Sequence, residues 1–95
     1  MKNIRWDRSK NEKLKSDRNV SFEAVLLAIT QGNTLDDFIH PDREKYPNQR
    51  LLVVKIQEYA YLVPYVETAT ELFLKTIIPS RKATKKYLSG SNNNE

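Results

Sequence analysis

Four cations stand within six consecutive positions near the end of the sequence, in the stretch "PSRKATKKYL" (79–88). They are Arg81, Lys82, Lys85 and Lys86, and no acid stands among them. A solvated surface helix usually mixes charges of both signs, so a one-sign cluster indicates an anionic partner. Phosphate is such an anion, because each phosphate neutralised by Lys or Arg releases counterions and adds affinity that does not depend on sequence.

The positive charge is concentrated at the two ends of the chain. The formal net charge is +4, from 16 Lys and Arg residues against 12 Asp and Glu residues. Residues 1–20 hold seven cations and three acids, residues 79–95 hold four cations and one acid, and residues 21–48 hold two cations and five acids. Basic ends suit a protein that binds a polyanion, and they also keep a small protein soluble without any partner. Composition leaves both interpretations open.

Residue counts exclude several kinds of chemistry. The chain has no cysteine, so it can form neither a disulfide framework nor a thiolate metal site, and His40 is its single histidine. The start "MKNIRWDRSK" is polar, and no apolar run approaches the roughly 20 residues that span a bilayer. We therefore expect a cytoplasmic protein without membrane segments that needs no metal and no other cofactor. Its 95 residues predict one domain with a modest core.

The first half of the sequence predicts two helices. The polar segment 7–18 forms the first, with Asp7 as its N-cap, and Asn19 takes the turn that follows. The segment "SFEAVLLAITQG" (21–32) forms the second, capped by Ser21 and ended by a glycine. One face of this helix is apolar at helical spacing and faces the core; it consists of Phe22, Val25, Leu26 and Ile29.

The second half predicts a sheet. The expected strands of the whole chain are 3–6, 34–39, 49–57, 61–67 and 71–78, with an exposed loop at 40–48. Turns at 58–60 and 68–70 are too short for a parallel crossover, so the last three strands form an antiparallel meander. Pro64 has no N–H, so its strand must be an edge there, carry a bulge, or pair only through its carbonyl groups.

The basic stretch forms the closing helix. Ser80 is its expected N-cap, and Ala83 and Tyr87, four positions apart, face the sheet. The element order is β-α-α-β-β-β-β-α, which is an α+β fold with helices packed on an antiparallel sheet. We expect one domain over residues 1–88 and a disordered tail over 89–95, where the sequence is low in complexity.

Two segments of the chain resemble the BrnT family of bacterial type II toxins. "WDRSKNEKLKSDRNVSFEA" (6–24) is similar to the N-terminal signature of that family, and "IPSRKATKKY" (78–87) resembles its ending. Between them, Arg50 and the "VPYVE" run resemble an Arg-led strand and a Val-x-Tyr-Thr-Glu strand. The matching positions at the two ends are Trp6, Asp7, Lys10, Val20, Ser21, Phe22, Ile78, Arg81, Lys82, Ala83 and Thr84.

The resemblance implies a RelE-like domain that cleaves RNA, arrests translation and is neutralised by a cognate antitoxin, BrnA-like or equivalent. DNA would then be contacted only through the antitoxin. The alternative is an RNA-binding or partner-binding module that keeps the fold without catalysis. A DNA-binding regulator is disfavoured, because the sequence shows no helix-turn-helix spacing.

Metal-free RNA cleavage uses the neighbouring 2′-OH as nucleophile, so the enzyme supplies a base, a proton donor and cations for the phosphate. Arg81 is the expected phosphate clamp, because its planar fork can hold two phosphate oxygens. The lysines expected to follow the RNA backbone are Lys82, Lys85, Lys86 and Lys75.

The sheet supplies the remaining catalytic candidates, Arg50, Tyr65 and Lys55. Arg50 could pair with a phosphate or with Glu44. Tyr65 could orient a proton or serve only in strand packing, and alternation puts Lys55 on the face of its own strand that carries Leu51 and Val53. The lone histidine, in a loop before a proline, is expected to be exposed, and Trp6 and Phe22 are expected in the core.

Overall fold

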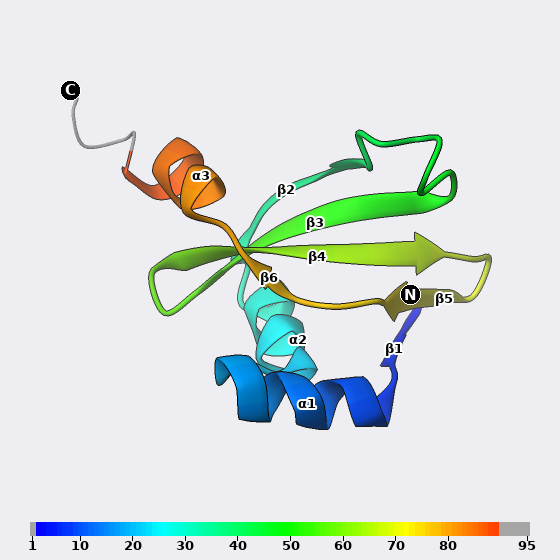
Figure 1. The fold of residues 1–95 in the computed structure, drawn as a ribbon, viewed down its shortest axis with the longest axis horizontal. Coiled ribbons are helices and arrows are strands. Elements are labelled where there is room, and N and C mark those ends of the chain that lie inside the picture. Colours follow the sequence, from blue (N-terminus) through cyan, green and yellow to red (C-terminus); the bar gives the residue numbers. More distant parts are fainter. Residues whose placement is uncertain (1, 90–95) are drawn as a thin grey trace.

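The computed structural model describes residues 2–89, which form one compact α+β domain (Figure 1). The elements are β1 (Asn3–Trp6), α1 (Arg8–Arg18), α2 (Phe22–Thr30), β2 (Thr34–Ile39), β3 (Gln49–Ile56), β4 (Tyr59–Glu67), β5 (Glu71–Leu74), β6 (Ile78–Pro79), α3 (Arg81–Thr84) and the π-helical turn η1 (Lys85–Ser89). The single α+β domain expected from the sequence is confirmed. The expected disordered tail lies outside the described residues except for Ser89, which ends η1.

Local signals define both long helices. Asp7 caps α1 by accepting a hydrogen bond from the Lys10 amide at 2.9 Å, and Asn19 ends it in the left-handed conformation, with φ 56°. Asparagine adopts positive φ more readily than most residues, because its short polar side chain hydrogen-bonds locally. Ser21 caps α2 through the Ala24 amide at 3.1 Å. The predicted caps and turn are confirmed.

The sheet is mixed rather than purely antiparallel. Its strand order is β1-β5-β4-β3-β2, and β6 pairs separately with β4. The pairs β2–β3, β3–β4 and β4–β5 are antiparallel as expected, but β1 lies parallel to β5. Parallel pairing is possible because the two helices and three strands between them provide the long connection that it needs. The expectation of a wholly antiparallel sheet is therefore wrong at this edge.

The hairpin between β3 and β4 is tighter than expected. Its turn consists of Gln57 and Glu58, with φ of 52° and 65°, and not of residues 58–60. Two consecutive positive φ values match the right-handed twist of the flanking strands, so such two-residue turns are favoured in hairpins. Neither residue is Gly, Asn or Asp, the residues that usually mark such a turn, so this turn could not be predicted from the sequence.

The strand expected over 71–78 is divided in two beside Pro64. β5 pairs with β4 up to Tyr65↔Leu74, and β6 resumes at Leu62↔Ile78, so two residues of β4 face three residues of the neighbouring segment. The Pro64 carbonyl accepts a hydrogen bond from the Lys75 amide at 2.8 Å. Both polar groups of an antiparallel residue point to the same side, so the N–H that proline lacks would face this interruption. Pro64 therefore pairs through its carbonyl, one of the three arrangements that its sequence context allows.

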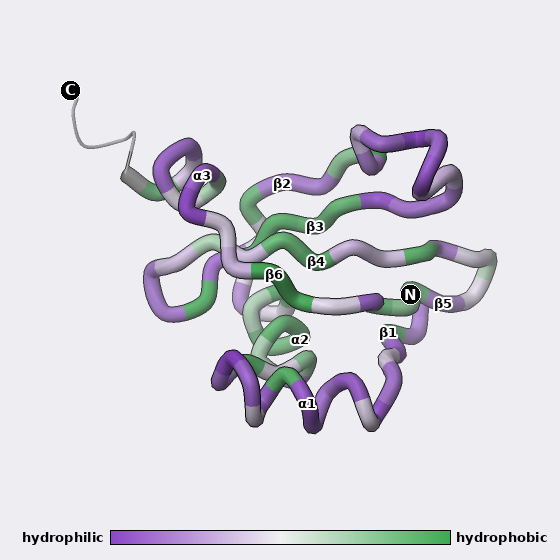
Figure 2. Tube along the Cα trace, viewed as in Figure 1, coloured by the Kyte–Doolittle hydropathy of each residue, from purple (hydrophilic) through white to green (hydrophobic). Residues whose placement is uncertain are grey.

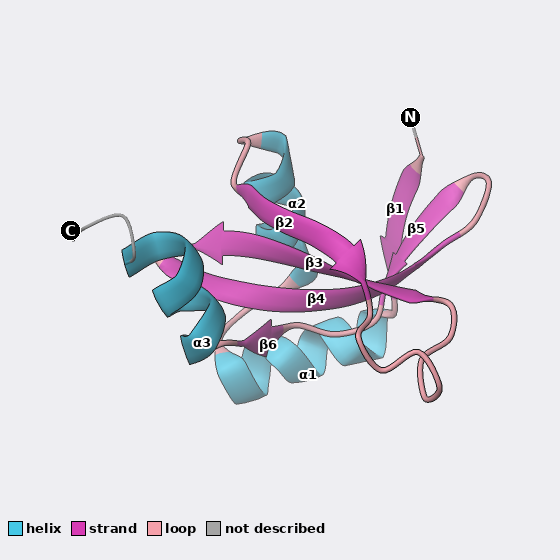
Figure 3. Cartoon of the chain, turned by 90° about the horizontal axis from the view of Figure 1, so that it is seen from above, coloured by secondary structure: helices cyan, strands magenta, loops and turns pink. Residues whose placement is uncertain are grey.

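Helices cover both faces of the sheet (Figure 3). The larger core lies between the sheet and the α1–α2 layer, and it includes Phe22, Val25, Leu52, Val63, Tyr65, Leu74 and Ile77. A smaller core lies under α3 and η1, where Ala83 contacts Val53 and Ala60. Figure 2 shows the apolar residues gathered along the central strands and α2, with polar residues along α1 and α3. On α2, Ala28 is buried, while the expected core residues Leu26 and Ile29 are only partly so.

Asn11 links α1 to the start of α2 from a buried position, with 3% of its surface exposed. Its side-chain carbonyl accepts a hydrogen bond from the Phe22 amide, and its amide group donates to Glu23 Oε1, both at 2.8 Å. The bond to Asn11 is the main cause that lowers the pKa of Glu23 below its usual value. This side chain therefore satisfies one of the free N–H groups at the start of α2.

We predict that Asn11→Ala lowers the free energy of unfolding by about 1–3 kcal/mol, because it leaves the buried Phe22 amide without its acceptor. Urea unfolding followed by circular dichroism measures the change. The control is Asn48→Ala, at an exposed loop position, which should stay within about 0.5 kcal/mol of wild type. Equal stabilities of the two variants would contradict the assignment.

Candidate functional site

The basic helix α3 is fixed on the sheet by hydrogen bonds to β4. The Ala60 amide donates to Thr84 Oγ1 at 2.9 Å, and the Ala60 carbonyl accepts from the Ser80 amide at 3.0 Å. Ser80 also caps α3 through the Ala83 amide at 3.0 Å, and Ala83 is buried. One residue of β4 therefore holds both ends of the short helix, and the expected roles of Ser80 and Ala83 are confirmed.

The turn η1 is fixed to the edge strand β2. The Tyr87 hydroxyl donates a hydrogen bond to Asp36 Oδ2, and Asp36 Oδ1 accepts from the Asp37 amide at 2.8 Å. The first of these bonds is the main cause that lowers the pKa of the Asp36 carboxyl. Tyr87 packs in the smaller core as the sequence predicted, and the Lys86 ammonium lies 5.2 Å from the centre of its ring.

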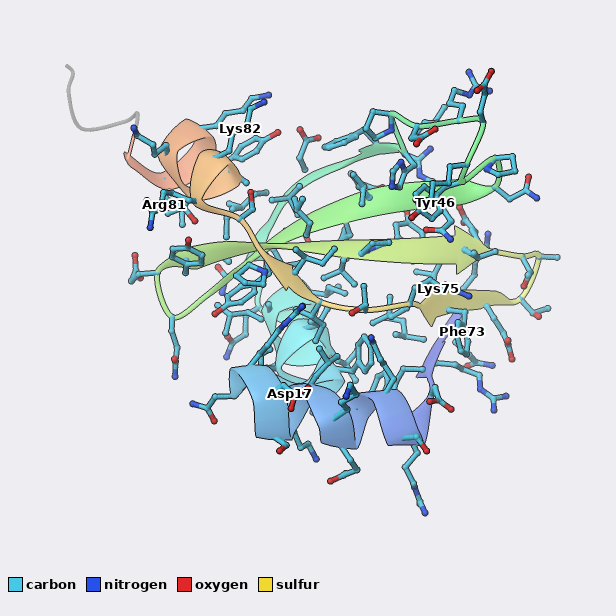
Figure 4. The ribbon with its side chains drawn as sticks, viewed as in Figure 1. Asp17, Tyr46, Phe73, Lys75, Arg81 and Lys82 are labelled. Carbon is cyan, nitrogen blue, oxygen red and sulfur yellow. The ribbon has the colours of Figure 1, made fainter. Side chains whose placement is uncertain are left out.

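Arg81 and Lys82 are exposed on α3 and project from different sides of it (Figure 4). Within residues 2–89, neither side chain forms a hydrogen bond or an ion pair with an acid. Lys85 and Lys86 are also exposed, and Asp36 is the acid whose charge interacts with Lys86. Arg81 and Lys82 therefore lie on a helix that is held firmly against the sheet, and no acid within residues 2–89 neutralises them.

A shallow groove of about 280 Å³ lies between α3 and the sheet. Lys82 and Lys86 stand on its rim. Apolar side chains from three strands line the groove: Phe38, Leu51, Val53 and Leu62. A concave apolar surface with cations beside it suits a ligand that carries both flat apolar groups and negative charge.

A second polar cluster lies at the far end of β3 and β4; it consists of Arg50 and Tyr65, both predicted from the sequence, and Asp37, which was not. Arg50 Nε lies 3.1 Å from the Tyr65 hydroxyl and 3.2 Å from Asp37 Oδ1. The Tyr65 hydroxyl lies 2.8 and 2.9 Å from the two oxygens of Asp37 and donates its proton to this carboxylate. Arg50 is thus paired with Asp37, and the alternative partner Glu44 is not used.

The cluster changes the acid–base properties of its members. Burial, followed by the hydrogen bond to Asp37, raises the pKa of Tyr65 to about 12. The bond to Tyr65 and the charge of Asp37 raise the pKa of Arg50 further. At neutral pH the tyrosine is protonated and its proton is directed at a carboxylate, so Tyr65 is unsuited to act as a general base.

The four predicted catalytic residues are not brought together. Arg50 pairs across the ladder with Tyr65, which belongs to the larger core, so both side chains lie on the α1–α2 face. Lys55 pairs with Ala60, which belongs to the smaller core under α3, and its ammonium lies 3.7 Å from Glu58. Arg81 is on α3 itself. Of the four predicted catalytic residues, Arg50 and Tyr65 therefore lie on one face of the sheet, and Lys55 and Arg81 lie on the other.

The remaining aromatic and imidazole candidates have structural partners. His40 Nδ1 accepts a hydrogen bond from the Asp42 amide at 3.1 Å, and its ring lies 4.5 Å from that of Tyr46. Trp6 stacks on Phe22, with ring centres 5.6 Å apart, and Phe22 is fully buried. The prediction that Trp6 and Phe22 are core residues is confirmed, whereas His40 is partly buried rather than fully exposed.

The residues that sequence reasoning missed are Asp36, Asp37 and Thr84. "TLDDFI" contains two adjacent acids, and strand alternation directs adjacent residues to opposite faces. That pattern could have indicated one carboxylate for each face, but not the tyrosine that each one binds. Within residues 2–89, no group of three or more His, Asp or Glu side chains is arranged to hold a metal ion, and no helix is long and apolar enough to cross a membrane.

Comparison with known proteins gives no match: no family model, curated protein or solved structure is significantly similar to this chain.

We predict that Tyr65 makes folding sensitive to alkali. A raised phenol pKa means that the folded protein holds this proton more tightly than the unfolded chain, where the pKa is about 10. The stabilisation is present below pH 10 and is lost as the pH rises toward about 12. The free energy of unfolding should fall more steeply across this window in wild type than in Tyr65→Phe.

Denaturant titrations at several pH values measure that slope, and tyrosinate absorbance follows the ionisation itself. Tyr46→Phe, in the loop before β3, is the control for removing a phenol that lies outside the cluster. If Tyr65→Phe keeps the wild-type slope, the coupling to Asp37 is wrong.

Proposed function

We propose that the protein is the toxin of a type II toxin–antitoxin pair, a metal-independent endoribonuclease that cuts RNA and thereby arrests translation. The observation that carries the proposal is the surface of α3, where Lys82 stands on the rim of an apolar groove and the exposed Arg81 and Lys82 have no acidic partner within residues 2–89. The resemblance of residues 6–24 and 78–87 to BrnT toxins supports the same assignment. A cytoplasmic RNA chain supplies both the phosphates and the flat bases that such a surface accommodates.

Arg81 is the residue that best fits contact with the scissile phosphate. Its guanidinium can donate two parallel hydrogen bonds to phosphate oxygens and stabilise the charge that develops on them during attack by the 2′-OH. α3 has only four residues, so its side chains, rather than its N-terminal amides, would bind the phosphate. Lys82 and Lys86 extend the positive surface along the groove.

The second candidate function is RNA or partner binding without catalysis. It is favoured by the high pKa of Tyr65 and by the separation of Arg50 and Tyr65 from Arg81, because no predicted base then stands near the predicted phosphate clamp. Incubation of the purified protein with bulk RNA in EDTA distinguishes the two functions. A toxin of the proposed class shortens the RNA, and a binding module leaves its length unchanged.

The proposed antitoxin would be encoded beside this protein and would present an acidic segment. The exposed cations of α3 are an electrostatic partner for such a segment, and complementary charge accelerates association. An inhibitor bound there would also exclude RNA from the same surface.

We predict that Arg81→Ala abolishes growth arrest and lowers the RNA cleavage rate by about 10²–10³-fold, the usual cost of one transition-state hydrogen-bond donor. Because Arg81 is exposed and has no acidic partner among the described residues, the variant should unfold at the wild-type denaturant concentration. Arg8→Ala is the control, since Arg8 is also an exposed first residue of a helix but lies on α1. Wild-type toxicity of a folded Arg81→Ala protein would refute the role.

We also predict that RNA affinity falls steeply with salt, and that Lys82→Ala combined with Lys86→Ala makes this dependence weaker. Each lost phosphate contact on a single strand reduces the slope of log K against log salt by about 0.7, so the double variant should lose about 1.4. Titration with a 2′-O-methyl RNA, which cannot be cleaved, gives the slope. Arg8→Ala with Lys10→Ala is the matched control on α1, and an unchanged slope in the α3 variant would place the RNA elsewhere.

A further inference from the structure

Phe73 of β5 is an aromatic side chain that takes no part in either core. It pairs across the ladder with Val66, one position after Tyr65, so it faces the side of the sheet that carries α3. Its neighbours Leu72 and Leu74 face the other side and pack in the larger core. Phe73 is only partly buried, and it belongs to neither of the two apolar clusters formed by the described residues.

Two cations flank this ring. The Lys75 ammonium lies 5.4 Å from the ring centre, and Figure 4 shows the two side chains next to each other at the end of β5. Arg5 pairs in register with Phe73 on the parallel neighbour β1, and its side chain is 64% exposed. The acid nearby is Glu71, whose carboxylate is 3.2 Å from Arg5. The surroundings of the ring therefore carry one positive charge more than negative.

The sheet face connects Phe73 to the groove beside α3. Leu51 lines that groove, and its ladder partner is Pro64. Val66 follows Pro64 on the same face and pairs with Phe73. A strand rises about 3.4 Å per residue, so the four steps from Leu62, under α3, to Val66 cover roughly 14 Å. These apolar residues form a strip with cations at both ends, in which Leu62, Val66 and Phe73 are partly exposed and Leu51 and Pro64 are buried between them.

We propose that this strip binds single-stranded RNA and that an unpaired base stacks on Phe73, with Lys75 and Arg5 directed at the adjoining phosphates. The proposal rests on the RNA-directed function proposed above and adds the form of the RNA and the residue that holds a base. Aromatic rings bind any unpaired base through its face, whereas a duplex keeps those faces stacked inside. The cations at both ends of the strip favour a polyanion over an apolar peptide as its ligand.

The test measures binding of a fluorescein-labelled 12-mer of 2′-O-methyl RNA by anisotropy, because this probe cannot be cleaved. Phe73→Leu keeps the apolar bulk and removes the aromatic face, and it should weaken binding by about 5- to 100-fold, the usual effect of losing one base–aromatic stack. Phe73→Trp should bind at least as tightly as wild type. Leu27→Ala, at an exposed apolar position on α2, is the control and should bind as wild type does.

A blunt duplex of the same sequence should bind more weakly than the single strand at equal salt. Equal affinity of Phe73→Leu and wild type for the single strand would overturn the stacking role while leaving RNA binding by α3 intact. If wild type binds no RNA at all, the proposed function fails as well, so the two failures are distinguishable.

Discussion

Pro64 is the constraint on which the arrangement of the C-terminal half depends. It stands in the middle of β4 with its carbonyl toward the next strand and without an N–H to offer, so the neighbouring chain cannot pair continuously past it. The interruption inserts one extra residue between β5 and β6, and this reverses the alternation of side chains. As a result Leu74 and Ile77, three positions apart, both enter the larger core.

The reversed alternation also determines where the basic helix begins. Arg18 from the end of α1 donates to the Ile77 carbonyl at 2.7 Å, which holds the crossing segment against the helical layer. β6 then pairs with Tyr61 and Leu62, and the chain reaches Ser80 on the opposite face of the sheet. The bulge beside Pro64 thus separates Phe73 and Lys75 on one side of the interruption from α3 on the other, along a single face.

Sequence reasoning succeeded where the signal is local. The caps at Asp7, Ser21 and Ser80 each depend on a side chain and an amide three residues apart, and all three were predictable. It failed where the partner is distant or the signal weak. The parallel pairing of β1 with β5 joins residues 68 positions apart, as in Asn3↔Glu71, and the Gln57-Glu58 turn lacks the residues that usually mark positive φ.

The residues of the candidate site also divide into those with a local sequence signal and those whose partner is distant in the sequence. The sequence identified the cations of α3, because a run of like charges is visible without a structure. It found Arg50 and Tyr65 but not Asp37, since the contact between Tyr65 and Asp37 spans 28 positions and depends on the register of two strand pairs. Alternation within β3 was sufficient to put Lys55 and Arg50 on opposite faces of the sheet. It could not show which of the two shares a face with Arg81, because that depends on which face α3 covers.

The α3 surface and the cluster of Arg50, Tyr65 and Asp37 differ in how many hydrogen-bond donors they leave for a ligand. Arg50 directs its Nε at Tyr65 and Asp37, and one terminal nitrogen lies 3.4 Å from the Asp37 carbonyl, so one edge of its guanidinium is already used inside the protein. Arg81 has no such partner within residues 2–89. A phosphate that approached Arg50 would compete with an existing carboxylate, whereas one that approached Arg81 would displace only water. Since both arginines carry the same charge, the difference in their partners, rather than their charge, makes α3 the stronger candidate for binding an anion.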